Sequence, residues 1–264
     1  MINVVAVAHG TDAPEGREAI NLLRESLSTT LNSFGARSNQ LFHVFEAYVD
    51  VQEPKLEGVL ASLPKSELCV VVPLLLSAGY HTQVDCERAA SASGIEDVRI
   101  AQALGPDRRL AHLQRKRLEE AGWTVSDTVV HASAGSSRAE GKEQMDAAAA
   151  LLAAELSTVD QSITAQGVST PDAPESSTRV VSSFVAAQSP SVSEAVAATG
   201  ADWVSSYLLI DGFFQSQLLS QAREANADVR CASALLNISD RTAVHTIASC
   251  AFDRVLAVLS SAPE

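Results

Sequence analysis

The sequence predicts an α/β protein made of two similar lobes, each a four-stranded parallel sheet flanked by helices. Short runs rich in Val, Ile and Leu alternate with amphipathic stretches of helical period, which is typical of βαβ units around a buried parallel sheet. Segments of the first half recur in the same order in the second half, which indicates two copies of one unit. The chain has 264 residues, of which 46% are apolar, and this is enough for two small cores.

In the first half, each strand is predicted from a short apolar run and each helix from the amphipathic stretch that follows. The expected strands are Val4–Ala8, Phe42–Val49, Leu68–Leu76 and Val98–Ala101, and the expected helices are Glu15–Leu31, Pro54–Leu63, His81–Ala92 and Asp107–Glu120. The last helix carries the basic run Arg108–Arg117, which we expect to form a solvated face.

The second half starts with an expected strand at Asp127–Ala132 and ends with an expected helix at Arg241–Leu259. We therefore expect an N-terminal lobe of residues 1–124, which carries the active site, and a C-terminal repeat lobe of residues 125–264. The polar run Ser157–Ser177 is rich in Ser, Thr and Pro and is expected to be an exposed loop. It is either an insertion or a lid over the site.

The two copies differ in three polar residues that follow predicted strands in the first copy. When the copies are aligned, His9 falls opposite Ala134, Asp50 opposite Ala186, and His81 opposite Phe214. A histidine alone is more often structural than functional, but the joint loss of all three counterparts would then be a coincidence. The first copy has therefore kept residues that bind metals and accept protons, and the second copy has a degenerate site.

These three residues are expected to meet at one edge of the first sheet. His9 closes the first strand, Asp50 closes the second, and His81 follows the third at the start of a helix. Ligands of open α/β sheets bind outside the carboxyl ends of the strands, and Gly10 and Gly79 permit tight turns or close ligand approach there. Two imidazoles and a carboxylate suit a divalent metal such as Fe²⁺, Co²⁺, Ni²⁺ or Zn²⁺, and they suit proton transfer near neutral pH.

Several other classes of protein lack support in the sequence. There is no HExxH, Walker-type or GxGxxG motif, and no GxSxG elbow, which argues against a metalloprotease, NTPase, dinucleotide enzyme or α/β-hydrolase. A mutase with a histidine at the first strand end would need an arginine beside it, which Ala8-His9-Gly10 lacks.

The net charge of -13 argues against nucleic acid as a partner. The N-terminus lacks a basic leader and the run Leu68–Leu76 is too short for a membrane span, so we expect a cytoplasmic protein.

Three motifs resemble those of the sirohydrochlorin chelatase family, the class II chelatases that insert Co²⁺ or Fe²⁺ into sirohydrochlorin. "HGT" (residues 9–11) stands where the family has His-Gly-Ser, and "YVDVQEP" (48–54) stands where it has Phe-Leu-Glu-x-x-x-Pro. "VVPLLLSAGYHTQVD" (71–85) matches the signature Val-Pro-Leu-x-Leu-x-x-Gly-x-His-x-x-x-Asp. Family members of this length are two-lobed, with the catalytic set in the first lobe. Asp50 replaces the glutamate that the family commonly has at this position.

The resemblance implies a lyase in siroheme or cobalamin biosynthesis, with sirohydrochlorin and a divalent metal as its substrates and with no further cofactor. His9, His81 and Asp50 would hold the metal and accept the two pyrrolic protons. Arg17 and Arg88 lie near this edge in sequence and are expected, with Gly10 and Gly79, to contact the substrate and its carboxylates.

The similarity to two-lobed, siroheme-making members favours Fe²⁺ over Co²⁺. We expect a monomer, because the tandem chain already supplies both lobes. The alternative is a carrier that binds the metal or the tetrapyrrole without turnover, an interpretation that the replacement of glutamate by Asp50 favours.

Overall fold

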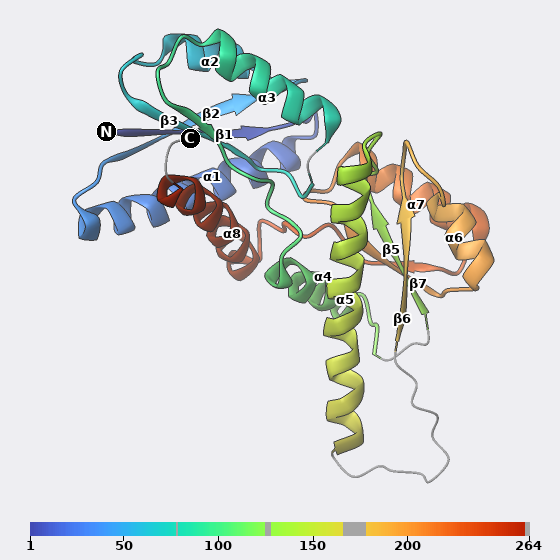
Figure 1. Cartoon of the computed structure of the whole chain (residues 1–264). Helices are drawn as coiled ribbons and strands as arrows, with labels where there is room; N and C mark the ends of the chain where they lie inside the picture. Colours follow the sequence, from blue (N-terminus) through green and yellow to red (C-terminus); the bar gives the residue numbers. More distant parts are fainter. Residues whose placement is uncertain (78, 125–127, 166–177, 262–264) are drawn as a thin grey trace. The chain divides into compact units, whose positions relative to one another are not determined.

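In the computed structural model the chain forms two compact α/β units (Figure 1), and the structure describes residues 1–77, 79–124, 128–165 and 178–261. Unit 1 consists of Met1–Gly105 and Leu236–Glu264, and unit 2 of Pro106–Leu235. Each unit contains a four-stranded parallel sheet, so the predicted fold class is confirmed. The division of the chain differs from the predicted boundary between residues 124 and 125, because the last helix of each repeat packs with the other repeat.

The sheet of unit 1 has the order β2-β1-β3-β4, with all neighbouring strands parallel. Its strands are β1 (Ile2–Ala8), β2 (Phe42–Tyr48), β3 (Leu68–Pro73) and β4 (Val98–Ile100). The two central strands, β1 and β3, are almost wholly buried, as expected for a parallel sheet covered on both faces. The carboxyl ends of β1, β2 and β3 lie side by side, and they position the candidate site.

Two pairs of helices cover the faces of the first sheet (Figure 1). On one face, α2 (Leu56–Ser62) and α3 (Tyr80–Ala92) share an apolar cluster with alternate residues of the strands. On the other face, α1 (Pro14–Ser38) and α8 (Arg241–Ser260) pack together and against the sheet. Among the described helices, only α8 is long and apolar enough to cross a membrane, yet its contacts with α1 and β3 are those of a core helix.

Unit 2 repeats this arrangement with the sheet order β6-β5-β7-β8. Its strands are β5 (Thr128–Ser133), β6 (Arg179–Phe184), β7 (Trp203–Tyr207) and β8 (Arg230–Cys231). The helices α6 (Val192–Thr199) and α7 (Phe213–Ala225) cover one face, and α4 (Arg108–Glu120) and α5 (Ala139–Ala165) cover the other.

The predicted loop Ser157–Ser177 is wrong in its first part, because residues 157–165 continue helix α5. The rest of that segment, residues 166–177, lies outside the described residues. Ser157 donates its hydroxyl to the carbonyl of Ala153, so a polar residue remains compatible with the helix there. Polar composition alone therefore placed the loop too early.

The predicted solvated face at Arg108–Arg117 is also wrong in part, because α4 buries Gln114 and Arg117 in unit 2. The guanidinium of Arg117 is 1% exposed and donates to the carbonyl of Leu235 at 2.9 Å and to Glu120 at 2.7 Å. These charge-assisted bonds satisfy a buried cation. The amphipathic pattern of a helix does not reveal that one of its arginines is buried against a carbonyl far away in the sequence.

An arginine on α8 makes the corresponding contact in unit 1. Arg254 donates to the carbonyls of Ala103 and Leu104 at 2.9 and 3.0 Å. Leu104 and Leu235 are equivalent in the two repeats, since the backbone amide of each bonds the segment after the third strand of its repeat. Helices α4 and α8, each of which packs with the other repeat, are thus each held by an arginine. The two arginines donate to the carbonyls of equivalent leucines, Leu235 and Leu104.

Candidate active site

The loops after β1 and β2 are joined by backbone hydrogen bonds that bring His9 and Asp50 together. The amide of Asp50 donates to the carbonyl of His9 at 2.9 Å, directly after the bond from Val49 to Ala8 at 3.0 Å. The strand pairing therefore continues past the ends of both strands as far as these two residues. Of the three predicted site residues, the structure places two as immediate neighbours at the carboxyl edge of the sheet.

Gly10 is required for this approach of the two loops. Its φ is +100°, and a Cβ built on it would lie 2.2 Å from the carbonyl oxygen of Asp50. A second cross-link lies beside it, since the amide of Thr11 donates to Oε1 of Gln52 at 2.8 Å. The loops are thus fixed by contacts that only glycine permits, and by a glutamine that the sequence motifs did not single out.

The side chains of His9 and Asp50 are open to solvent. The carboxylate of Asp50 is 71% exposed, and its Oδ1 accepts a bond from the amide of Val51 at 2.8 Å. Nζ of Lys55 lies 3.9 Å from the same oxygen. Two residues joined by a backbone hydrogen bond therefore carry an accessible imidazole and an accessible carboxylate, and the carboxylate is oriented through one of its two oxygens.

His81 is the second residue of α3, and its side chain lies outside the described residues. The chain leaves β3 along the end of β1, because the amide of Leu74 donates to the carbonyl of Val7 at 2.8 Å. Gly79 is the N-cap of α3 and has an extended backbone, with φ -71° and ψ 144°. The helix thus begins at the same edge of the sheet. Among the described side chains, no three His, Cys, Asp or Glu residues form a group that would hold a metal ion.

The two arginines predicted to contact the substrate both have partners. Nε of Arg17 donates to the carbonyl of Thr11 at 2.8 Å, and Nη2 lies 3.4 Å from Asp12, so Arg17 supports the loop after His9. Arg88 lies 2.7 Å from Asp85 and 3.4 Å from a carboxylate oxygen of Glu57. Both arginines remain well exposed, at 46% and 63% of the side chain.

A polar network beside the site was not predicted from the sequence. Tyr48, at the end of β2, is fully buried and donates its hydroxyl to Glu46, and Arg24 of α1 lies 3.0 Å from Glu46. Burial and the neighbouring carboxylate raise the pKa of the Tyr48 phenol. The network ties α1 to the strand that carries Asp50. Its sequence signal is a glutamate inside a largely apolar strand.

The second repeat keeps the backbone of this edge and lacks the side chains of the predicted site. The amide of Ala186 donates to the carbonyl of Ala134 at 3.1 Å, as Asp50 does to His9. Gly135 has a φ of +93°, and its built Cβ would lie 1.9 Å from the carbonyl oxygen of Ala186. The amide of Ser136 faces Oε1 of Gln188 at 3.4 Å, which corresponds to the Thr11–Gln52 contact.

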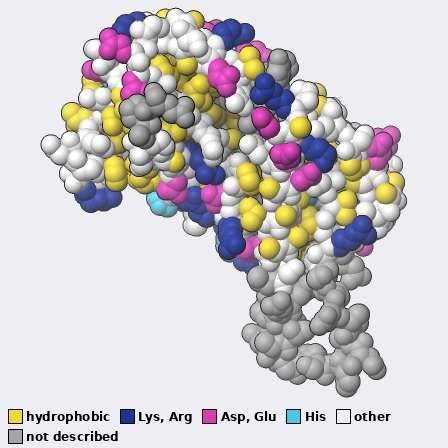
Figure 2. Space-filling model, in the orientation of Figure 1, with side chains coloured by type: hydrophobic (Ala, Val, Ile, Leu, Met, Phe, Trp, Pro, Cys, Tyr) yellow, Lys and Arg dark blue, Asp and Glu magenta, His cyan; other side chains and the backbone are white. Residues whose placement is uncertain are grey.

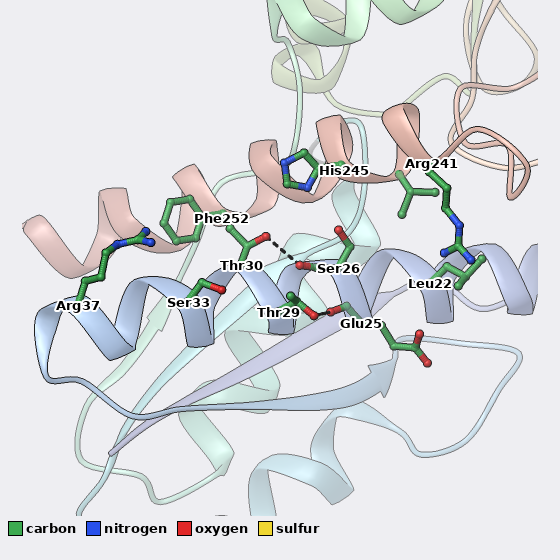
Figure 3. Close-up of a pocket in the computed structure, with 11 residues that line it drawn as sticks. Leu22, Glu25, Ser26, Thr29, Thr30, Ser33, Arg37, Arg241, His245 and Phe252 are labelled. Carbon is green, nitrogen blue, oxygen red and sulfur yellow. Dashed lines mark hydrogen bonds between the residues drawn. The ribbon is translucent and has the colours of Figure 1, made fainter.

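A groove of about 520 Å³ lies elsewhere in unit 1, between α1 and α8 (Figure 3). Hydroxyls of α1 line it together with Arg37, Arg241 and His245. None of the predicted site residues contributes to it. It is a gap along two packed helices, whereas the predicted site residues lie at the carboxyl edge of the sheet.

The surface charges do not gather into a patch of one sign on the face shown in Figure 2, where basic and acidic side chains are interspersed. On this face, an anionic ligand would therefore have to be bound by individual basic residues.

The duplicated sheet and its carboxyl edge have the architecture of a two-lobed, chelatase-like α/β protein. Residues 3–121, in the N-terminal repeat of this chain, match the CbiX family model. No curated protein sequence matches the chain.

Several solved structures share the fold over nearly the whole chain. SirB from Bacillus subtilis with Fe³⁺ has a TM-score of 0.67 and 18% identity, and covers 98% of this chain and 96% of its own. SirB from Bacillus subtilis subspecies spizizenii, a sirohydrochlorin chelatase in complex with cobalt, has a TM-score of 0.64 and 18% identity, with coverages of 97% and 94%. CbiX, described as the terminal enzyme of siroheme biosynthesis in denitrifying bacteria, has a TM-score of 0.64 and 17% identity, with coverages of 98% and 100%.

Proposed function

We propose that this protein is a sirohydrochlorin chelatase that inserts a divalent metal ion into sirohydrochlorin, with Fe²⁺ favoured over Co²⁺. The observation that carries the proposal is the backbone bond that holds His9 beside Asp50 at the edge where α3 begins with Tyr80 and His81. The match of residues 3–121 to the CbiX family model and the titles of the similar structures, which name sirohydrochlorin, siroheme, Fe³⁺ and cobalt, support the choice of substrates.

The residue types suit the chemistry of metal insertion. The macrocycle must lose two pyrrolic protons while the metal ion loses water, so the site needs neutral ligands that bind the metal weakly and a base for the protons. An imidazole at His9, and one at His81, would serve as such ligands near neutral pH. The carboxylate of Asp50 would balance the metal charge and accept a proton, while Lys55 and the amide of Val51 fix its orientation.

The carboxylates of the substrate call for cations near this edge. Arg17 fits this role because Nε is held by the carbonyl of Thr11 while the guanidinium stays exposed. Arg88 would have to share its guanidinium with Asp85 and Glu57. The proposal includes a cytoplasmic monomer, with no cofactor beyond the substrate metal.

The test is steady-state metallation, followed by the absorption change of the tetrapyrrole with enzyme well below substrate, using anaerobic Fe²⁺ and then Co²⁺. Many turnovers per molecule support the chelatase, and a single stoichiometric burst supports a carrier instead. We expect His9→Ala to lose turnover while its melting temperature stays unchanged, because His9 is exposed. His43→Ala is the matched control, since His43 is exposed near the amino end of β2. Equal activity of the two variants would refute the assignment of the site.

A further inference from the structure

The two repeats differ in how the paired helices α1 and α8, and α5 and α4, are joined. In unit 2, the carboxylate of Glu155 on α5 connects the pair, since its Oε1 lies 2.9 Å from Nε of Arg115 and 2.9 Å from Nδ1 of His112, both on α4. In unit 1, the pair α1 and α8 leaves the open groove of about 520 Å³ that Figure 3 shows. A comparison of the repeats shows what the groove lacks.

The first helix of each pair can be aligned through related sequences near its start. Helix α1 contains "EGRE" (15–18) and α5 contains "EGKE" (140–143). Counted from the first glutamate of these runs, Thr30 corresponds to Glu155. The first repeat therefore has a short hydroxyl side chain where the second has the carboxylate that joins the helices.

The second helix of each pair aligns in the same way. Helix α8 starts at "DRTAVH" (240–245) and α4 at "DRRLAH" (107–112), and the aspartate is the N-cap in both. His245 thus corresponds to His112, and Figure 3 shows it above Thr30. Unit 1 has the imidazole of this contact and lacks its carboxylate.

Two arginines of the groove also have no carboxylate partner among the described residues. Arg241 lies one turn before His245 on the same side of α8, and Arg37 lies at the other end of the groove (Figure 3). The acidic residue of the lining, Glu25, points away from α8. The groove therefore offers two guanidinium groups and an imidazole to an anion that comes from outside.

Hydroxyls of α1 line the groove between these basic groups. Thr29 and Thr30 each donate to a backbone carbonyl one turn earlier at 2.9 Å, which leaves their oxygens free to accept. The hydroxyls of Ser26 and Ser33 have no partner among the described residues and can donate. The size of the groove is in the range of small-molecule sites. This lining matches a small anion that carries several carboxylates and a hydroxyl group.

We propose that the groove between α1 and α8 binds a small polycarboxylate, with one of its carboxylates in the place that Glu155 holds in the second repeat. Arg241 and His245 contact that carboxylate, and Arg37 contacts a second one. The groove contains none of the predicted residues of the candidate active site, so this inference does not depend on the proposed function.

The test measures binding of citrate, a hydroxylated tricarboxylate, to the whole protein by isothermal titration calorimetry at low ionic strength. We expect Arg241→Gln to bind citrate roughly tenfold more weakly than the wild-type protein, as for the loss of a charge-assisted hydrogen bond. Arg108→Gln is the matched control, because Arg108 is the exposed first residue of α4 as Arg241 is of α8. It changes the net charge equally and should keep the wild-type affinity for citrate.

A second variant tests the comparison of the repeats directly. Thr30→Glu supplies the carboxylate that Glu155 supplies in unit 2, so it should pair with His245 and weaken citrate binding at least tenfold. Thr30→Val, which removes the hydroxyl without adding a charge, should still bind citrate. All four variants should keep or slightly raise the wild-type melting temperature, because none of the changed side chains is fully buried.

Each result supports or overturns the inference. It is refuted if the wild-type protein does not bind citrate, or if Arg108→Gln loses as much affinity as Arg241→Gln. Unchanged binding by Thr30→Glu would show that the ligand does not take the place of Glu155. Equal affinity for acetate would exclude a site for polycarboxylates, and binding of an oligoglutamate peptide without binding of citrate would replace the small molecule with an acidic peptide. Any of these failures leaves the chelatase proposal standing, since metallation is measured separately.

Discussion

His131 offers a quantitative test of the core of unit 2. Its ring lies on β5, is 0% exposed, and contacts Tyr207 with ring centroids 5.1 Å apart. Neither ring nitrogen has a hydrogen-bond partner among the described residues. Burial lowers the pKa of His131 from 6.5 to about 4, although the residue's own backbone and, less strongly, Asp146 act in the opposite direction. We therefore expect His131 to make unit 2 sensitive to acid.

The sign and size follow from the two pKa values. The unfolded chain binds a proton at His131 below about pH 6.5, but the folded chain binds it only near pH 4, so stability falls as the pH drops through this window. Between pH 7.5 and pH 5 this single group should remove about 2 kcal/mol of stability. His131→Leu lacks the group, so its loss of stability over the same range should be smaller by about 2 kcal/mol.

Urea unfolding at the two pH values measures this difference, with tryptophan fluorescence as the probe. Both tryptophans, Trp123 and Trp203, lie in the apolar cluster under α4 and α5, so the signal reports on unit 2. His245→Gln, at an exposed position of α8, is the control and should keep the pH dependence of the wild-type protein. If His131→Leu loses as much stability as the wild-type protein between pH 7.5 and pH 5, the buried neutral imidazole is not the cause.

Two further predictions concern the candidate site. Gly10→Ala should lower metallation at least tenfold and reduce thermal stability, because its Cβ meets the carbonyl of Asp50. Gly58→Ala places its Cβ in open space inside helix α2, so it should leave metallation unchanged and keep or slightly raise thermal stability. Melting curves and metallation rates of the two variants check this, and equal behaviour would contradict it. Asp50→Glu should retain activity while Asp50→Asn loses about 10²-fold in steady-state rate, as expected for loss of a base; wild-type rates for both variants would exclude Asp50 from the reaction.

The repeated βαβ pattern was sufficient to predict the fold and to place His9 and Asp50 at one edge of the first sheet. Apolar runs predicted all four strands of the first sheet, and strand order alone brought His9 next to Asp50. The sequence did not predict which sheet α4 covers, because an amphipathic face indicates burial but not its partner. Gln52 and Glu46 were missed for a related reason, since the contact of Gln52 with Thr11 and that of Glu46 with Arg24 are long-range and leave no local periodicity.

The exchange of α4 and α8 has a consequence for how this chain can be divided. A polypeptide of residues 1–124 would keep α4, whose buried face has its contacts in unit 2, and would lack α8, which covers the first sheet beside α1. A polypeptide of residues 125–264 would keep α8 and would lack α4. The division would also separate Arg117 from the carbonyl of Leu235, and Arg254 from the carbonyl of Ala103. Neither half is then an independent folding unit, but the two halves expressed together would each complete the other. A single-repeat protein of this topology would need a second copy to lend it the missing helix.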